Sequence, residues 1–102
     1  MATKTAKSLT ENMTFKLDQK SGVLIGVRRF YTAFLGTFRI SICISQKNSN
    51  KSISIESLRH PPLSMLGGKF FTDLKQADKI IAEYMAWIDK IDKEVGMIVT
   101  RL

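Results

Sequence analysis

The chain has 102 residues, of which 44% are hydrophobic and 25% are charged, and its formal net charge is +7. This balance is typical of one globular domain and excludes a disordered chain, and no apolar run approaches the ~20 residues that span a bilayer. The single cysteine, Cys43, excludes an intrachain disulfide and fits a reducing compartment. The sequence therefore predicts a cytoplasmic protein without membrane contact.

The positive charge is confined to the first part of the chain. Residues 1–60 contain ten Lys and Arg against three Asp and Glu, a balance of +7, whereas residues 61–102 contain six of each kind. Such asymmetry predicts an electropositive face, which favours an acidic partner such as nucleic acid, an anionic membrane or an acidic protein.

The chain begins with a polar segment, and we expect residues 1–12 to form a flexible tail and residues 13–102 to form a single domain. Residues 13–17 alternate apolar and polar side chains and predict a first strand. Residues 18–22 then supply a turn. A second strand is expected from residue 23 through residue 31, before Gly36 permits a reversal.

The clearest strand pattern follows this reversal. Phe38, Ile40, Ile42 and Ile44 alternate with smaller or polar residues, and Ile53 and Ile55 resume the pattern after a polar turn at 47–50. Pairing Ile44 with Ile53, and Ile42 with Ile55, places these isoleucines on one face of a hairpin. The same register sets Cys43 opposite Ser54 on the other face.

The last third of the chain predicts one long helix. Thr72 is the expected N-cap, and apolar residues recur at 3-4 spacing from Leu74 to Val95. Gly96 is the expected stop, which gives a helix of about 23 residues or roughly 35 Å. Residues 97–102 then form a final strand or a packed tail. The predicted fold is α+β: a small antiparallel sheet of three to four strands, with one long C-terminal amphipathic helix on its apolar face.

The residue types argue against catalysis. The only histidine, His60, precedes two prolines in an expected loop, and no serine, cysteine or carboxylate stands at a known catalytic spacing from it. The acidic residues of the helix alternate with lysines, as on a solvated face. One His and one Cys do not supply the usual metal ligands, and the glycines match no phosphate-binding motif. We expect no enzyme, cofactor or metal.

Residues 27–40 set arginines among aromatic side chains, and two interpretations stay open for them. They form either a core strand with arginines at its edges or a surface that holds an acidic partner. Phe38 shares the parity of the isoleucines and is expected in the core, while Tyr31 is the best candidate for an exposed ring. The candidate site for nucleic acid or an acidic partner consists of Lys16, Arg28, Arg29, Tyr31, Arg39, Lys47 and Lys51.

The alternating hairpin followed by "GKFFTDLKQADKII" resembles integrase arm-binding domains and plant ethylene-response-factor DNA-binding domains over roughly residues 22–85. The resemblance implies a sheet that enters a DNA groove, with Arg28, Arg29 and Arg39 at the positions that contact DNA. The strand tryptophans of those domains are absent here, and "RHPPLSML" is inserted between sheet and helix. We therefore do not assign the chain to that family.

The helix stripe has two interpretations as well. Docking onto the chain's own sheet is the simpler one, but a 3-4 repeat also suits pairing with a second copy. A helix of ~35 Å overhangs strands of about six residues, which reach only ~20 Å. The candidate patch for a partner or a homodimer consists of Tyr84, Trp87, Ile88 and Ile91.

The sequence thus predicts a small, non-catalytic, basic binding module that contacts nucleic acid through the side of its sheet. The alternative is a protein-binding inhibitor or adaptor of the kind that phages and mobile elements encode, such as an anti-defence protein.

Overall fold

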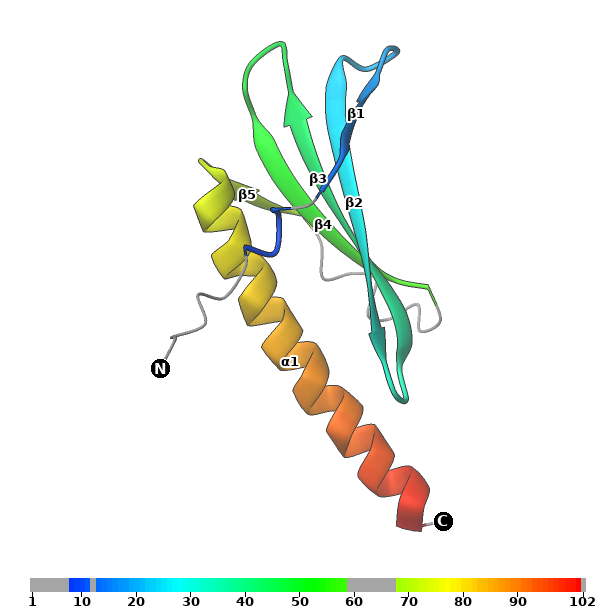
Figure 1. Cartoon of the computed structure of the whole chain (residues 1–102). Coiled ribbons are helices and arrows are strands. Elements are labelled where there is room, and N and C mark those ends of the chain that lie inside the picture. Colours follow the sequence, from blue (N-terminus) through cyan, green and yellow to red (C-terminus); the bar gives the residue numbers. More distant parts are fainter. Residues whose placement is uncertain (1–7, 12, 59–67, 102) are drawn as a thin grey trace, which may run out of the picture.

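The computed structural model of the chain describes residues 8–11, 13–58 and 68–101. The described residues form five strands and then one helix (Figure 1). The strands are β1 (Phe15–Asp18), β2 (Val23–Thr32), β3 (Gly36–Ser45), β4 (Lys51–Ser57) and β5 (Lys69–Phe71), and the helix is α1 (Leu74–Arg101).

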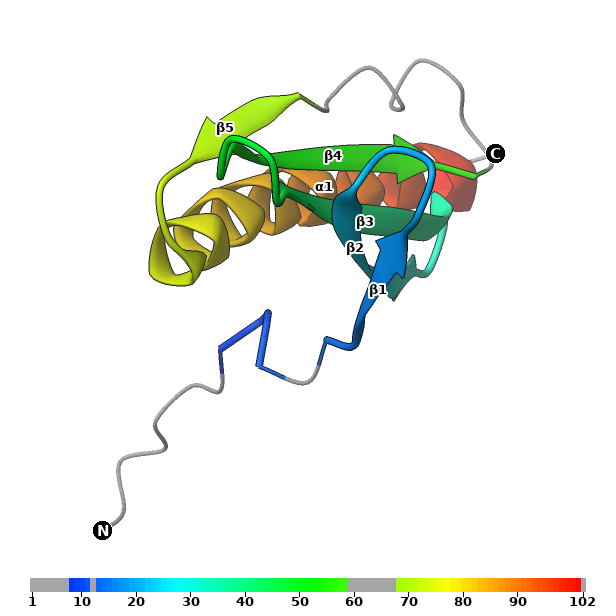
Figure 2. The ribbon, with the colours of Figure 1, turned by 90° about the horizontal axis from the view of Figure 1, so that it is seen from above.

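The strands form one antiparallel sheet in the order β1-β2-β3-β4-β5, and α1 lies across one face of it (Figures 1 and 2). The expected α+β class is confirmed. The sheet has five strands rather than three to four, because residues 69–71 add a short edge strand. Three residues are too few to show a period, so the sequence pattern does not reveal β5.

Alternate residues of the central strands build the core between sheet and helix. Phe38, Ile40 and Ile42 of β3 and Ile53 and Ile55 of β4 are fully or almost fully buried. They pack with three residues of the helix that recur at its own period, namely Ala77, Ile81 and Ile88. The two periods meet in one apolar layer, which leaves the other face of the sheet without a described helix (Figure 2).

The central hairpin exists, but its expected register is wrong by two residues. Ile42 lies opposite Ile53 and Ile40 lies opposite Ile55, while Ile44 pairs with Lys51. A shift of two keeps every side chain on its expected face, since successive residues of a strand alternate between faces. The loop at 46–50 sets the register: Asn50 N–H donates to the Asn48 side chain at 3.1 Å, and Ser49 has a positive φ of 59°.

The helix begins one residue later than expected and continues past its expected stop. Asp73, not Thr72, is the N-cap, because its side chain accepts a hydrogen bond of 2.8 Å from Gln76 N–H. The Gln76 side chain in turn accepts the backbone N–H of Thr72 at 2.7 Å.

Gly96 is buried inside the helix rather than ending it. A side chain at this position would collide with the ring of Phe34, so the glycine serves close packing against the β2–β3 turn. Residues 97–101 are consequently the last turns of α1, neither a strand nor a separate tail.

Residues 8–11 belong to the segment expected as a tail, and they contact the start of α1. The carboxylate of Asp78 accepts Thr10 N–H at 2.9 Å and also accepts the Ser8 hydroxyl. Thr10 is buried, and Leu9 packs against the core. These contacts connect the N-terminal segment to the helix.

No helix among the described residues has the length and apolar character needed to span a membrane.

Candidate functional site

The strand register divides the sheet residues between two faces. Residues directly opposite one another on neighbouring strands share a face, so every partner of a core residue points toward α1. Phe30 pairs with Phe38 and belongs to this helix-facing side. The neighbours on either side of it in sequence, Arg29 and Tyr31, therefore point to the opposite side.

We call this opposite side the open face, since no described helix or strand covers it. Its residues come from all five strands, and the register places them in rows across the sheet. The open face carries Lys16 and Asp18 of β1; Val23, Ile25, Val27, Arg29 and Tyr31 of β2; Thr37, Arg39, Ser41, Cys43 and Ser45 of β3; Ser52, Ser54 and Glu56 of β4; and Phe70 of β5.

One row of the open face sets two arginines side by side. Arg29 lies directly opposite Arg39, and Arg39 lies opposite Glu56. The Arg39 guanidinium donates to the Glu56 carboxylate at 2.6 Å, with both side chains more than a third exposed. This ion pair offsets the repulsion between the two arginines. Among the described residues, Arg29 has no acidic partner, so it is the cation of this row most available to a ligand.

Arg28 lies on the helix-facing side, away from Arg29 and Arg39. It pairs with Ile40 across the sheet, its guanidinium stacks on the Phe30 ring at 5.0 Å, and it donates to the Leu9 carbonyl at 2.5 Å. These contacts give Arg28 a role in holding the N-terminal segment. The match of Arg28 to a DNA-contacting position, which the resemblance implies, does not agree with this placement.

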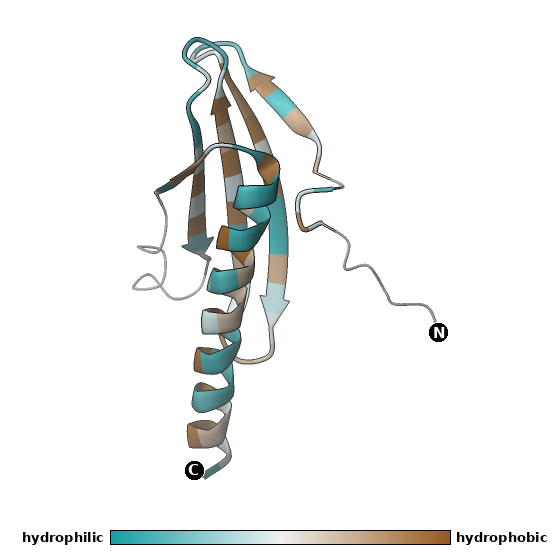
Figure 3. Cartoon of the chain, turned by 90° about the vertical axis from the view of Figure 1, so that its left-hand side faces the viewer, coloured by the Kyte–Doolittle hydropathy of each residue, from teal (hydrophilic) through white to brown (hydrophobic). Residues whose placement is uncertain are grey.

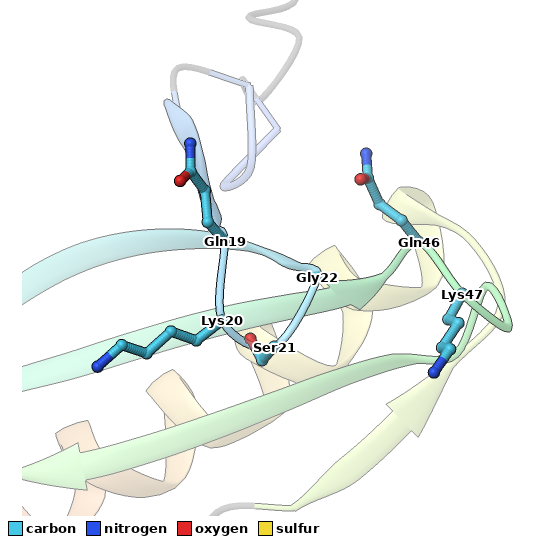
Figure 4. Close-up of a pocket in the computed structure, with 6 residues that line it drawn as sticks. All are labelled: Gln19, Lys20, Ser21, Gly22, Gln46 and Lys47. Carbon is cyan, nitrogen blue, oxygen red and sulfur yellow. The ribbon is translucent and has the colours of Figure 1, made fainter.

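Two further cations of the predicted site lie near the end of the sheet. Lys51 is on the helix-facing side and donates to the Thr72 carbonyl at 3.1 Å, just before α1. Lys47 lies in the β3–β4 loop, beside an open hollow of about 440 Å³ that Lys20 also lines. Figure 4 shows that the ammonium groups of Lys20 and Lys47 do not converge on a common point. The hollow is therefore no ready-made anion site.

Two aromatic rings stand free on the open face. Tyr31 is 78% exposed, as expected, and Phe70 is 74% exposed. They lie three strands and about six residues apart, so the rings are at opposite corners of the face, roughly 25 Å from each other. Phe70 is not among the residues predicted from the sequence. In the strand Lys69–Phe71, Phe71 is buried and its neighbour Phe70 is exposed. Phe70 could be predicted as exposed only if these three residues were first recognised as a strand.

Cys43 lies on the open face, as predicted, between Ile25 and Ser52. Burial raises the pKa of its thiol above the ordinary value. The raised pKa keeps the thiolate fraction small at neutral pH, which disfavours nucleophilic or redox chemistry at this residue.

The predicted patch on the helix is divided by the packing. Ile88 is fully buried in the core and is not available to a partner. Tyr84 and Ile91 are half-buried, and Trp87 is 42% exposed. Tyr84 also accepts a cation–π contact from Lys69 of β5 at 5.9 Å.

Asp92 of α1 is buried, and its carboxylate holds a turn of the sheet instead of lying on the solvated face of the helix. Its Oδ1 accepts the backbone N–H groups of Phe34 and Leu35 at 2.8 and 2.9 Å. Burial alone would raise the pKa of Asp92, but these hydrogen bonds outweigh that effect and lower it below the ordinary value. Asp92 thus fixes the β2–β3 turn against the helix.

In the part of the chain that the structure describes, no group of three or more His, Cys, Asp or Glu is placed to hold a metal ion. His60 lies outside the described residues.

Comparison with known proteins adds no relative: no protein-family model matches the chain, and no curated protein or solved structure is significantly similar to it.

Proposed function

We propose that the chain is a small, non-catalytic module that binds single-stranded nucleic acid on the open face of its sheet. One observation carries the proposal: an uncovered sheet face combines the cations Lys16, Arg29 and Arg39 with two freely exposed rings, Tyr31 and Phe70. Cations neutralise phosphates, and exposed rings stack on bases that are not paired with another strand.

The distribution of charge over the whole molecule favours the sheet over the helix. The sheet and its connections, residues 13–58 and 68–73, contain eight Lys and Arg against three Asp and Glu, a net charge of +5. Helix α1 contains five of each and is neutral. An anionic polymer is therefore attracted to the sheet and not to the helix.

The separation of the rings favours an extended strand. Tyr31 and Phe70 stand at opposite corners of the open face, and the diagonal between them crosses β3 near Arg39 and β4 near Ser54. A path of roughly 25 Å holds several nucleotides of a single strand, with a base stacked at each end. Arg28 and Lys51 point to the helix side, and we place them outside this contact.

The proposal is tested by the binding of a fluorescently labelled single-stranded oligonucleotide to variants of the full chain. We expect Arg29→Ala to weaken binding and to reduce the slope of log affinity against log salt by about 0.7, since one phosphate contact is lost. Phe70→Ala removes a stacking contact, so it should weaken binding by about 1–3 kcal/mol and leave the salt slope unchanged.

Lys75→Ala is the matched control, because Lys75 is an exposed cation at the start of α1, far from the open face. Its affinity should stay within about twofold of the wild type. Circular dichroism of each variant checks that the fold is retained. If Lys75→Ala weakens binding as much as Arg29→Ala, the interaction follows total charge and the proposed face is wrong.

A protein-binding inhibitor or adaptor is the second candidate, and the centre of the open face favours it. Val27 is 44% exposed and Ile25 is half-buried, and Arg39 already forms an ion pair with Glu56. An apolar centre with a charged rim is typical of protein interfaces. This candidate predicts that the chain binds no oligonucleotide even at low salt.

A further inference from the structure

A second apolar surface runs along the flank of α1, beside the side that packs on the sheet. With 3.6 residues per turn, one stripe contains residues 80, 84, 87, 91 and 98. Trp87 is 42% exposed and Ile98 is 62% exposed, although both are large apolar side chains. The last turns of α1 extend past the ends of the strands, and Figure 3 shows hydrophobic residues on them. The flank stripe consists of Ile80, Tyr84, Trp87, Ile91 and Ile98.

Four charged residues follow the outer edge of the flank stripe and alternate in sign. They are separated by seven, four and seven positions, so they lie in one line on the helix. All four are exposed, and among the described residues none of them has an ion-pair partner. In chain order this charged edge is Glu83, Lys90, Glu94 and Arg101.

We infer that α1 pairs antiparallel with α1 of a second copy of the chain, about a two-fold axis close to Asp92. Antiparallel pairing reverses the order of the charged edge, so Glu83 meets Arg101 of the second copy. By the same reversal, Lys90 meets Glu94 of the second copy. The two-fold axis repeats both contacts, so all eight charges of the two edges are paired with an opposite charge.

The same alignment covers the exposed apolar residues. Ile98 packs on Trp87 of the second copy, and the symmetry repeats this contact, while Ile91 lies near the axis. The contact from residue 83 to residue 101 is about 27 Å long. It leaves the core side of α1, with Ile88, on its own sheet.

The charge pattern selects a second copy over other occupants. In a parallel two-fold pair this charged edge would lie beside the core-facing flank of the second helix, so its charges would not meet one another, whereas the antiparallel pair brings every one against an opposite charge. The helix has no net charge, so neither nucleic acid nor a strongly acidic protein is drawn to it. An axis perpendicular to the helix pair also points the open faces of both copies in one direction, so the dimer would present two open faces to one ligand. The dimer itself does not depend on nucleic-acid binding by these faces.

The first test is the mass of the full chain in solution by analytical ultracentrifugation, from about 1 to 100 µM. The wild type is expected to form a dimer within this range. Ile98→Glu buries an unpaired charge against Trp87 of the second copy and should raise the dissociation constant at least ~100-fold, with an unchanged circular dichroism spectrum. A wild type that is monomeric at about 100 µM, or a dimer that Ile98→Glu leaves intact, would overturn the inference.

A charge swap tests the antiparallel alignment without touching the apolar stripe. Glu94→Lys alone puts two lysines opposite one another, twice per dimer, and should weaken the dimer roughly tenfold. Lys90→Glu combined with Glu94→Lys exchanges the two signs and should restore the wild-type affinity. Lys75→Glu, which lies outside the stripe, is the control and should leave the dimer unchanged. A double variant as weak as the single variant would contradict this pairing.

Discussion

Asp92 is the residue whose role differs most from its appearance in the sequence. It stands in a helix among lysines and other acids, and such a carboxylate is ordinarily solvated. Here it is buried and accepts two backbone N–H groups from the β2–β3 turn. The sequence does not reveal this, because the partners of Asp92 are backbone groups almost 60 residues away. Every residue has such a backbone N–H group except proline, so the residue types do not indicate which one binds the carboxylate.

The loss of this carboxylate should destabilise the domain. Asp92→Ala leaves the N–H groups of Phe34 and Leu35 without their acceptor, so we expect the unfolding temperature to fall by about 5 °C or more. Asp89→Ala is the control, because Asp89 is exposed and only forms a surface ion pair with Lys93 at 3.2 Å. Thermal unfolding followed by circular dichroism compares the two, and equal losses would refute the role of Asp92.

The pH dependence of stability follows from the same contact. The folded state lowers the pKa of Asp92, so its stabilising contribution is present above the ordinary pKa of about 3.9 and is lost as the pH falls through the lower, folded value. The wild type should therefore lose more stability than Asp92→Ala between about pH 5 and pH 2. Parallel acid-unfolding curves for the two proteins would contradict this.

At the scale of elements, the sequence patterns predict which segments are strands and which faces they bury, but not how they align. The β3–β4 hairpin has its isoleucines on the expected face in a register that differs by two residues. Parity cannot distinguish registers that differ by two, since both bury the same side chains. The difference arises in the loop, where Ser49 adopts a positive φ that the residue type does not require.

Helix α1 shows a similar limit at its ends. Glycine after a run of apolar residues is a common helix stop, and the sequence predicts one at Gly96. The structure uses this glycine for contact with the Phe34 ring, which comes from a distant turn. The contact with Phe34 therefore explains the glycine, and the helix continues past the residue at which the local sequence predicts its end.

The register is testable with the natural cysteine of the chain. Cys43 lies opposite Ser52, so Ser52→Cys should form a disulfide with it under mild oxidation. Ser54→Cys is the control: it lies opposite Ser41, two residues along the strand, and should remain a free thiol. Thiol titration or mass spectrometry of the oxidised proteins distinguishes the two. A disulfide in Ser54→Cys alone would support the register predicted from sequence instead.

At the scale of the whole molecule, one layer of apolar packing leaves two surfaces uncovered among the described residues: the open face of the sheet and the flank of α1. The location of the excess charge on the sheet could be predicted from the sequence, as could the exposure of Tyr31. The composition of the open face could not, since Arg28 and Arg29 are neighbours in sequence but lie on opposite sides of the sheet. Phe70 joins that face only because a three-residue strand pairs with β4.

The central claim, nucleic-acid binding on the open face, is tested most directly by fluorescence anisotropy of a labelled single-stranded oligonucleotide against the wild-type protein. The titration is repeated from about 50 to 300 mM salt. Contacts from Lys16, Arg29 and Arg39 to three phosphates predict a slope of log affinity against log salt near −2, with tighter binding to the single strand than to its duplex. No binding of either form at about 50 mM salt would contradict the claim and would favour a protein partner for the open face.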